Sequence, residues 1–293
     1  MQKKKILITW GKGMLAYDFY RTQKEKYEII LVDREECDIT SFEEVMQCIS
    51  LHEPDILLNC AAYTAVDDAE DIGARVNYDV NALWVYYLAK ATSVFGVEFI
   101  TISTDYVFDG QKSDRYLPTD TPNPINAYGM AKYLWERLAM SENPRTIIIR
   151  TSWLYGWELY DGNSDGKWIF KNFVNTMLRL SETLDEIKVV DDQHGRPTSC
   201  IDLSEYIASH VEKWEDVEWG IYHFSSPRKE FSITWADFAE EIFAKYEKST
   251  KVVRCGSSQY PTKAVRPAFS LLINNSEIVL RNWRDWSVKY MEK

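Results

Sequence analysis

The sequence has 293 residues, of which 45% are hydrophobic and 27% charged, so it can bury a large core and is not a mostly disordered chain. The net charge of −11 argues against a nucleic-acid-binding surface, because such a surface needs clustered cations to meet phosphates. No segment approaches the run of about 18 apolar residues that a membrane span requires. We therefore expect neither a nucleic acid nor a membrane as a partner.

Cysteine and histidine are sparse and scattered along the chain. The five cysteines form no CxxC pair, and an odd, dispersed set of this kind is typical of reduced thiols in a cytosolic protein. The basic run at residues 3–5 is followed by too short an apolar stretch for a signal peptide. The four histidines show no metal-ligand spacing. We predict a cytoplasmic location and no metal site.

Short apolar runs alternate with helical patterns over the first half of the chain. Strands are expected at Ile6–Thr9, Glu28–Asp33, Asp55–Asn59, Val97–Ser103 and Thr146–Arg150, and helices at Met14–Gln23, Ser41–Ser50, Val80–Phe95 and Tyr128–Met140. Ser41 fits a helix N-cap and Gly96 a C-cap. Strict alternation predicts an α/β fold with a doubly wound parallel sheet, in which ligands bind beyond the carboxyl ends of the strands.

The regular alternation ends after Arg150. A polar insertion at Trp157–Lys167 precedes expected helices at Ile169–Leu180, Ile201–Lys213 and Thr234–Tyr246, with short strands at Lys188–Val190 and Ile221–Phe224. This pattern predicts one domain over residues 1–155 and a smaller one over residues 156–293. Segments around 186–200 and 219–226 are expected to return to the large sheet.

A glycine-bearing loop joins the first strand to the first helix. Gly11 and Gly13 let the backbone turn and approach a pyrophosphate, and Ala16 is small enough for close packing of the helix on the sheet. Amide groups at the helix start would then face the phosphates. The alternative is an ordinary tight turn. The position of the loop favours a Rossmann-type dinucleotide site and makes residues 1–155 the dinucleotide-binding domain.

Asp33 ends the second strand, about 20 residues after this loop, where a ribose-binding acid belongs. Its carboxylate would accept hydrogen bonds from the adenosine ribose, which suits NADH. Arg34 follows at once and can pair with a 2′-phosphate, so NADPH stays open as the cofactor.

Tyr128 and Lys132 stand four residues apart, on one face of a predicted helix. A phenol there can give a proton to a carbonyl oxygen, and we expect the neighbouring ammonium to lower the pKa of the phenol from its usual value of about 10. The Tyr-x-x-x-Lys pattern is common by itself. Ser103 and Thr104, which end the fourth strand, add hydroxyls that can hold a substrate oxygen beside the phenol.

These segments together resemble an extended short-chain dehydrogenase, and most closely the dTDP-4-dehydrorhamnose reductase family. The resemblance covers nearly the whole chain. The matching segments are Asn59–Asp67, Ser103–Gly110, Asn126–Lys132, Arg150–Tyr155, Asp192–Thr198 and Arg266–Pro267.

The resemblance implies a role for each matching residue. It implies Thr104, Tyr128 and Lys132 as the catalytic triad. Cofactor-binding residues are then Gly11, Lys12, Gly13, Met14, Leu15, Asp33, Arg34, Asp38, Ile39, Cys60, Ala61, Ala62, Tyr63, Tyr128 and Lys132. Substrate-binding residues are Thr64, Val66, Thr104, Asp105, Tyr106, Trp153 and Arg266, and residues 156–293 are then mainly a substrate-binding domain.

The chain departs from the family pattern at three places. Trp10 stands where the family usually has its first loop glycine, and Ala16 where it has the last. Ala131 replaces the usual hydroxyl residue before the catalytic lysine. The insertion at Trp157–Lys167, with Lys171 in place of a family asparagine, alters a loop near the substrate.

The resemblance implies a reductase that transfers hydride from NADPH or NADH to the C4 ketone of a dTDP-4-keto-6-deoxy sugar, giving dTDP-L-rhamnose or a close relative. The expected partner is this nucleotide-sugar, with a homodimer left open. One alternative is a non-catalytic cofactor-binding subunit resembling the regulatory subunit of methionine adenosyltransferase. Another is an epimerase or dehydratase of the same superfamily. A dehydratase is disfavoured because no Glu follows Asp105.

Overall fold

The computed structural model describes residues 3–156, 171–226 and 232–274, and its centre is a six-stranded parallel sheet. The strands are β1 (Lys5–Thr9), β2 (Glu28–Val32), β3 (Ile56–Asn59), β4 (Glu98–Thr104), β5 (Thr146–Thr151) and β10 (Gly220–His223). Their order across the sheet is β10-β5-β4-β3-β1-β2, and every neighbouring pair is parallel. The order reverses between β1 and β3, which is where ligands bind in sheets of this kind.

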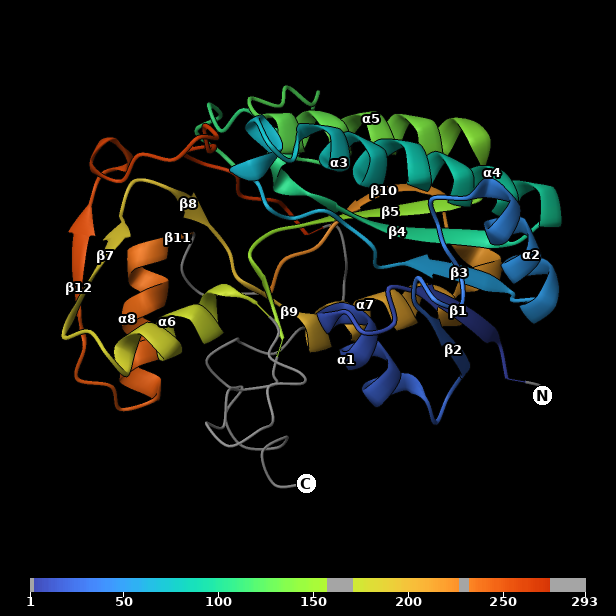
Figure 1. Cartoon of the computed structure of the whole chain (residues 1–293), viewed down its shortest axis with the longest axis horizontal. Coiled ribbons are helices and arrows are strands. Elements are labelled where there is room, and N and C mark those ends of the chain that lie inside the picture. Colours follow the sequence, from blue (N-terminus) through green and yellow to red (C-terminus); the bar gives the residue numbers. More distant parts are fainter. Residues whose placement is uncertain (1–2, 157–170, 227–231, 275–293) are drawn as a thin grey trace.

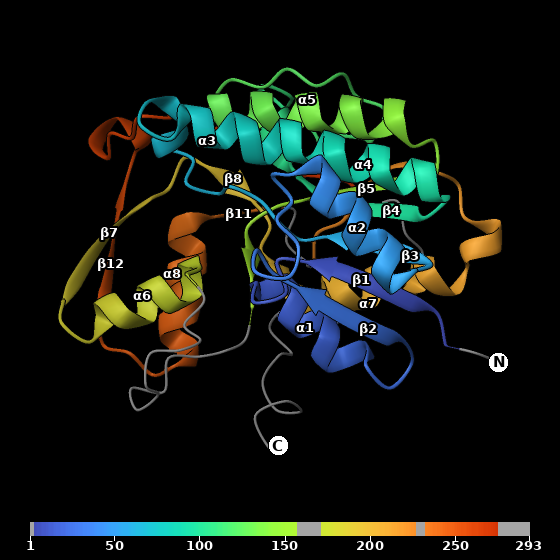
Figure 2. The same ribbon diagram turned by 45° about the vertical axis from the view of Figure 1, so that its right-hand side comes forward.

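Helices cover both faces of the sheet (Figure 1; Figure 2). On one side lie α1 (Met14–Gln23) and α7 (Cys200–Glu212), and on the other α2 (Phe42–His52), α4 (Trp84–Phe95) and α5 (Ala127–Glu142). Side chains of β1 alternate between the two resulting cores. Ile6 and Ile8 pack with α1 and α7, whereas Leu7 packs with α2, α4 and α5. The predicted doubly wound α/β sheet is confirmed.

The predicted helix ends in the first half agree closely with the structure. The side chain of Ser41 caps α2 by accepting from the backbone N–H of Glu44, and Gly96 ends α4 in the left-handed region at φ 69°. The helix expected at Val80–Phe95 is longer than predicted. It is continuous with a π-helical turn at Asp79–Leu83 and with α3 (Ala74–Tyr78), because the polar run before Val80 hides the apolar periodicity.

A smaller lobe carries α6 (Phe173–Ser181) and α8 (Trp235–Lys245) beside three two-stranded sheets. These sheets pair β7 (Glu186–Val190) with β12 (Lys251–Cys255), β8 (His194–Gly195) with β11 (Ile233–Thr234), and β6 (Leu154–Tyr155) with β9 (Thr198–Ser199). In Figures 1 and 2 most of this lobe lies to one side of the large sheet, facing the carboxyl ends of its strands.

One predicted sheet segment is wrong and one is placed as expected. The segment around 219–226 returns to the large sheet as β10, but the segment around 186–200 forms β7, β8 and β9 in the small sheets instead. The reason is visible in β7, where Ile187 and Val189 are buried while Glu186 and Lys188 are exposed. A strand with a single apolar face does not fit a parallel sheet covered on both sides.

Two sequence predictions fall partly or wholly outside the described residues. The insertion at Trp157–Lys167 lies there, and so does the expected start of a helix at Ile169. Within the described part of the chain, no helix is long and apolar enough to cross a membrane. The five cysteines are all free, as the scattered spacing predicts.

Candidate active site

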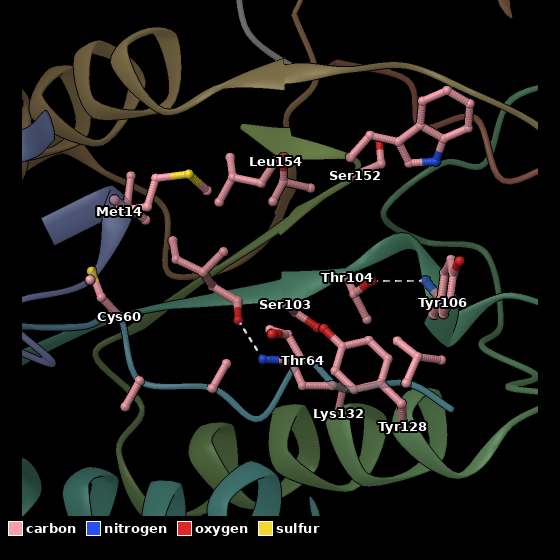
Figure 3. A pocket seen from close by; sticks show the side chains of 18 of the residues that line it. Met14, Cys60, Thr64, Ser103, Thr104, Tyr106, Tyr128, Lys132, Ser152 and Leu154 are labelled. Carbon is pink, nitrogen blue, oxygen red and sulfur yellow. Dashed lines mark hydrogen bonds between the residues drawn. The ribbon is translucent and has the colours of Figure 1, made fainter. Parts of the chain in front are cut away.

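A cavity of about 550 Å³ opens at the carboxyl ends of β1, β3, β4 and β5. It brings together segments that are far apart in the sequence: the loop after β1, the loop after β3, the end of β4, the first turns of α5 and the residues after β5 (Figure 3). Predicted site residues that line it are Lys12, Gly13, Met14, Leu15, Cys60, Ala61, Ala62, Thr64, Val66, Thr104, Asp105, Tyr106, Tyr128, Lys132 and Trp153.

A second cavity of about 540 Å³ adjoins the first at the end of β2. Trp10, Lys12, Ala62 and Thr64 line both cavities, so these residues mark the junction. The predicted cofactor-binding residues on the second cavity are Lys12, Asp33, Arg34, Asp38, Ile39, Ala62 and Tyr63. The two cavities together extend from the end of β2 to the first turns of α5.

The loop after β1 turns at Trp10. Its φ of 59° lies in the left-handed region that favours glycine, and its carbonyl accepts a hydrogen bond from the amide of Gly13 at 2.8 Å. A Cβ on Gly13 would lie 2.6 Å from Cδ1 of the Trp10 ring, so the indole packs directly on the loop. Trp10 therefore makes the turn in the place where the family has glycine.

Gly11 was predicted to bind the cofactor, but the structure places it outside both cavities. Its amide donates to the carbonyl of Val32, and an added Cβ would lie 2.7 Å from the Cβ of Leu31. The loop packs closely against β2 at this glycine, and a contact of its backbone with a cofactor stays a prediction.

Asp33 holds the glycine loop as well as facing the second cavity. One carboxylate oxygen accepts from the backbone amide of Lys12 at 3.1 Å and lies 3.8 Å from the Lys12 ammonium. Arg34, the candidate partner of a 2′-phosphate, pairs through Nε with Asp38 at 3.3 Å. The end of β2 thus offers both a carboxylate and two cations to a bound ribose.

Several contacts fix the start of α5, which carries Tyr128 and Lys132. The side chain of Asn126 accepts from the amide of Gly129 at 2.7 Å and caps the helix. The Ala127 backbone donates to Glu70 at 2.8 Å and accepts from the Asn77 side chain at 3.0 Å. Gly129 lets the helix approach β4 closely, because a Cβ there would lie 2.1 Å from the carbonyl oxygen of Tyr106.

The residues of the predicted triad lie close together at the end of β4. The hydroxyl of Thr104 donates to Asp105 at 3.0 Å and accepts from the amide of Tyr106 at 3.2 Å, and its influence on Tyr128 lowers the pKa of that phenol. The Lys132 ammonium donates to the carbonyl of Ile102 at 2.7 Å (Figure 3). It also lies 3.0 Å from the ring centroid of Trp135.

The pKa of the Tyr128 phenol is shifted in the direction opposite to our prediction. Burial raises it, the Asp105 carboxylate raises it further, and the hydrogen bond to Thr104 only partly offsets these effects. Lys132 is not among the groups that shift the pKa of the phenol. Burial lowers the pKa of Lys132 itself, and the charge of Glu136 acts in the opposite direction. The phenol is therefore protonated at neutral pH, as a proton donor must be.

Asp105 is a buried carboxyl in the middle of the site. Its two oxygens accept from the hydroxyls of Thr104 at 3.0 Å and Ser270 at 2.5 Å. Burial raises its pKa to about 6, although these hydrogen bonds act in the other direction. The charge beside Tyr128 and Tyr106 therefore changes near neutral pH.

Arg266 was predicted to bind substrate, and the structure leaves it outside both cavities. Its guanidinium pairs with Asp67 through two contacts of 2.7 and 3.1 Å, and it interacts electrostatically with Tyr106. Asp67 lies in the loop after β3, at the end of the matching segment Asn59–Asp67. Arg266 is linked to the cavity through Tyr106, which lines it.

Sequence reasoning missed several cavity residues. Ser152 and Leu154 follow β5, and the rule that ligands meet the carboxyl ends of strands would have found them. Trp235 comes from the smaller lobe, for which the sequence gives no comparable rule, whereas Lys171 lines the cavity as its expected position near the substrate suggests. The ring of Trp235 stacks on that of Trp153 with centroids 3.6 Å apart, so the predicted Trp153 is held by a residue 82 positions away.

The sheet order and the cavity at its reversal point define a Rossmann-type α/β fold. A UDP-glucose 4-epimerase of Thermus thermophilus, which is 16% identical, shares this fold with a TM-score of 0.71. A family model described as the RmlD substrate binding domain matches residues 4–292.

Known dTDP-4-dehydrorhamnose reductases are more similar. The one from Aggregatibacter actinomycetemcomitans is 38% identical over 92% of this chain and 90% of its own length. The crystal structure of the one from Bacillus anthracis, in complex with NADP, has a TM-score of 0.87 at 32% identity and covers 97% of this chain and 96% of that one. The structure from Clostridium acetobutylicum has a TM-score of 0.85 at 36% identity, covering 96% and 95%. The chain belongs to the dTDP-4-dehydrorhamnose reductase family.

Proposed function

We propose that this protein reduces the C4 ketone of a dTDP-4-keto-6-deoxy sugar, with NADPH or NADH as the hydride donor, giving dTDP-L-rhamnose or a close relative. The observation that carries the proposal is that Thr104, Tyr128 and Lys132 all line the larger cavity. This cavity adjoins the second one at Trp10. Membership in the family supports the same reaction. Its relatives bear the name of this activity.

The residues of the chain have distinct tasks in this reaction. Tyr128 donates its phenolic proton to the C4 oxygen, because its raised pKa keeps that proton in place until the oxygen gains charge. Thr104 holds the same oxygen through its hydroxyl, which already lies within hydrogen-bonding distance of its neighbours. Lys132, one helical turn from Tyr128, stabilises the phenolate that forms. The nicotinamide, when bound, supplies the hydride.

The described residues fit a dinucleotide. Asp33, Arg34 and Lys12 face the cavity at the end of β2, where the adenosine ribose would lie. Gly13, Met14 and Leu15 begin α1 at the wall of the larger cavity, where backbone amides can meet a pyrophosphate. Asp33 suits a free ribose hydroxyl, and Lys12 with Arg34 suits a 2′-phosphate, so both nicotinamide cofactors are included in the proposal.

The proposed substrate lies between the two lobes. Trp235 and Lys171 of the smaller lobe line the same cavity as residues at the strand ends of the large sheet, and Trp153 stacks on Trp235. We therefore propose residues 1–155 as the dinucleotide-binding domain and residues 156–293 as mainly the substrate-binding domain, with β10 returned to the sheet. We also propose a cytoplasmic enzyme that forms a homodimer, which sedimentation at micromolar concentration would test.

The decisive experiment follows NADH and NADPH oxidation with a panel of nucleotide-4-keto sugars. We expect turnover with dTDP-4-dehydrorhamnose, and slower turnover when the base is uracil or guanine. An inactive protein that still binds a nicotinamide cofactor in calorimetry would contradict the proposal and favour a binding subunit.

A further inference from the structure

A buried ion pair lies one helical turn beyond the catalytic lysine. Glu136 on α5 and Arg150 on β5 are each only 1% exposed, and they form a bidentate pair with contacts of 2.8 Å to Nε and 2.6 Å to Nη2. A buried pair of this kind is weak evidence for stability, because desolvation opposes the attraction between the charges. Its presence inside the fold therefore calls for another explanation.

Further bonds fix both members of the pair. The hydroxyl of Ser103 donates to Oε1 of Glu136 at 2.5 Å, and the third nitrogen of Arg150 lies 3.3 Å from Nε2 of His223. Nδ1 of His223 faces the carbonyl of Tyr116 at 3.0 Å, so this nitrogen carries the ring proton and Nε2 accepts from Arg150. Burial and the neighbouring guanidinium lower the pKa of His223 to about 3, so the ring is neutral.

The position of Glu136 relates it to the site. Tyr128, Lys132 and Glu136 recur every four residues, so they share one face of α5. Ser103, which binds Glu136, precedes Thr104 on β4. The carboxylate thus touches the strand that carries the substrate-binding hydroxyl and follows the ammonium on the helix that carries the proton donor.

The surroundings of Lys132 leave few sources of negative charge. The ammonium is buried, and its hydrogen bond goes to an uncharged carbonyl. The other groups near it are the protonated phenol of Tyr128, the Asp105 carboxyl beyond Thr104, the neutral His223 and the cationic Arg150. The charge of Glu136 raises the pKa of Lys132 against the effect of burial.

We propose that Glu136 is a positioning residue that keeps Lys132 protonated, and that Arg150, Ser103 and His223 hold its carboxylate in place for that purpose. The inference rests on the proposed reductase function, in which the ammonium form of Lys132 carries the activity. Activity is then lost on the alkaline side as Lys132 loses its proton. Removal of the carboxylate moves this loss to lower pH.

The test measures kcat against pH with dTDP-4-dehydrorhamnose and NADPH for Glu136→Gln and for Glu136→Gln with Arg150→Met. The double variant removes the carboxylate without leaving a buried guanidinium unpaired. We expect the alkaline limb to move down by about one pH unit or more in Glu136→Gln, a tenfold loss in proton affinity at Lys132. The double variant should move it by a smaller amount, because it also loses the cationic Arg150. The Glu98→Gln variant, which breaks the ion pair with Arg145 at the start of β4, is the matched control and should not move the limb.

Titration of the protein with ¹³Cε-labelled lysine gives a second readout, in which Lys132 is assigned by the resonance that Lys132→Arg removes. The midpoint should move down with the kinetic limb. If the wild-type chain has no reductase activity, the proposed function fails while this midpoint still decides the role of Glu136. A folded Glu136→Gln variant with an unchanged limb and midpoint would overturn the inference. So would a double variant that does not fold, since the pair would then be structural.

Discussion

Tyr128 lines the cavity together with Thr104, and its ring lies edge-on to that of Tyr106 at 6.0 Å between centroids. Because the phenol supplies the proton in the proposed reaction, Tyr128→Phe should lower kcat by about 100-fold or more. Calorimetry should find NADPH affinity nearly unchanged, since the backbone of α5 is untouched. The control is Tyr133→Phe, on the same helix but outside the two cavities, which should keep its turnover. Near-normal turnover of Tyr128→Phe would remove the residue from this role.

Asp105 gives the folded state a pH dependence with a definite sign. Its pKa rises from 3.8 to about 6 on burial, so the folded protein binds this proton more tightly than the unfolded chain does. The stabilising contribution is complete below about pH 4 and is lost as the pH rises through 6. The shift corresponds to about 3 kcal/mol. Asp105→Asn, which carries no charge, should therefore gain stability relative to the wild type between pH 5 and pH 8.

Denaturant unfolding of both proteins at the two pH values measures this difference. Asp109→Asn provides a control of opposite sign, because hydrogen bonds from Gln111 and Asn123 hold the pKa of Asp109 below its usual value. Its stability relative to the wild type should fall between pH 3 and pH 8. A parallel pH dependence for Asp105→Asn and the wild type would show that the buried carboxyl does not titrate as described.

Asp33 faces the second cavity and also binds the amide of Lys12. Asp33→Ala should weaken NADH binding by roughly tenfold or more, because a hydrogen bond from a ribose hydroxyl to a charged group contributes about 1.5–3 kcal/mol. NADPH should lose less, since its 2′-phosphate is repelled by the same carboxylate. Calorimetric titrations with both cofactors give the ratio directly. Equal losses would mean that Asp33 supports the loop without contacting the ribose.

At the scale of whole elements, α5 is placed by its N-terminal turn. Gly129 is the closest point, where a Cβ would lie 2.1 Å from the Tyr106 carbonyl oxygen. Gly129→Ala should push the helix from the end of β4, destabilise the fold by about 1–3 kcal/mol and lower kcat by moving Tyr128 away from Thr104. Met130→Ala, an exposed position on the same turn, should change neither. Urea unfolding and kcat should be measured on both; an active, fully stable Gly129→Ala would contradict this placement.

Elements were predictable from the sequence where a single local pattern determines them. Each of β1, β3 and β5 contains three consecutive apolar residues, and the capping residues Ser41 and Gly96 mark helix ends in the sequence itself. The π-helical turn at Asp79–Leu83 was not predicted, because tertiary contacts hold it. Asn81 within it binds both backbone groups of Tyr63 and the side chain of Asn77.

At the scale of the whole molecule, residues of the large sheet and of the smaller lobe line the same site. The residues at strand ends were predictable, because the alternation of strands and helices puts those ends at one edge. The contributions of Trp235 and the pairing of Arg266 with Asp67 were not, since each joins positions that only the packed fold brings together. The arrangement of Lys132, Glu136 and Arg150 was predictable only in part. The helical spacing of Lys132 and Glu136 can be read from the sequence, whereas the pairing of Glu136 with Arg150 on β5 cannot.

Trp10 joins the two cavities and is therefore the residue whose change tests the molecule as a whole. Its ring is 48% exposed and packs on the Gly13 turn, so it can move over a bound cofactor without leaving a buried core. Trp10→Gly also removes the cost of a left-handed non-glycine residue, about 1–2 kcal/mol. We expect the variant to be more stable and to change its affinity for NADH and NADPH by less than tenfold, about 1.4 kcal/mol. Calorimetric titration of the native chain and of Trp10→Gly with both cofactors distinguishes this outcome from the alternative, in which the Trp10 ring fills the phosphate site. In that case the native chain would bind neither cofactor and the variant would recover binding, which would favour a binding subunit over a reductase.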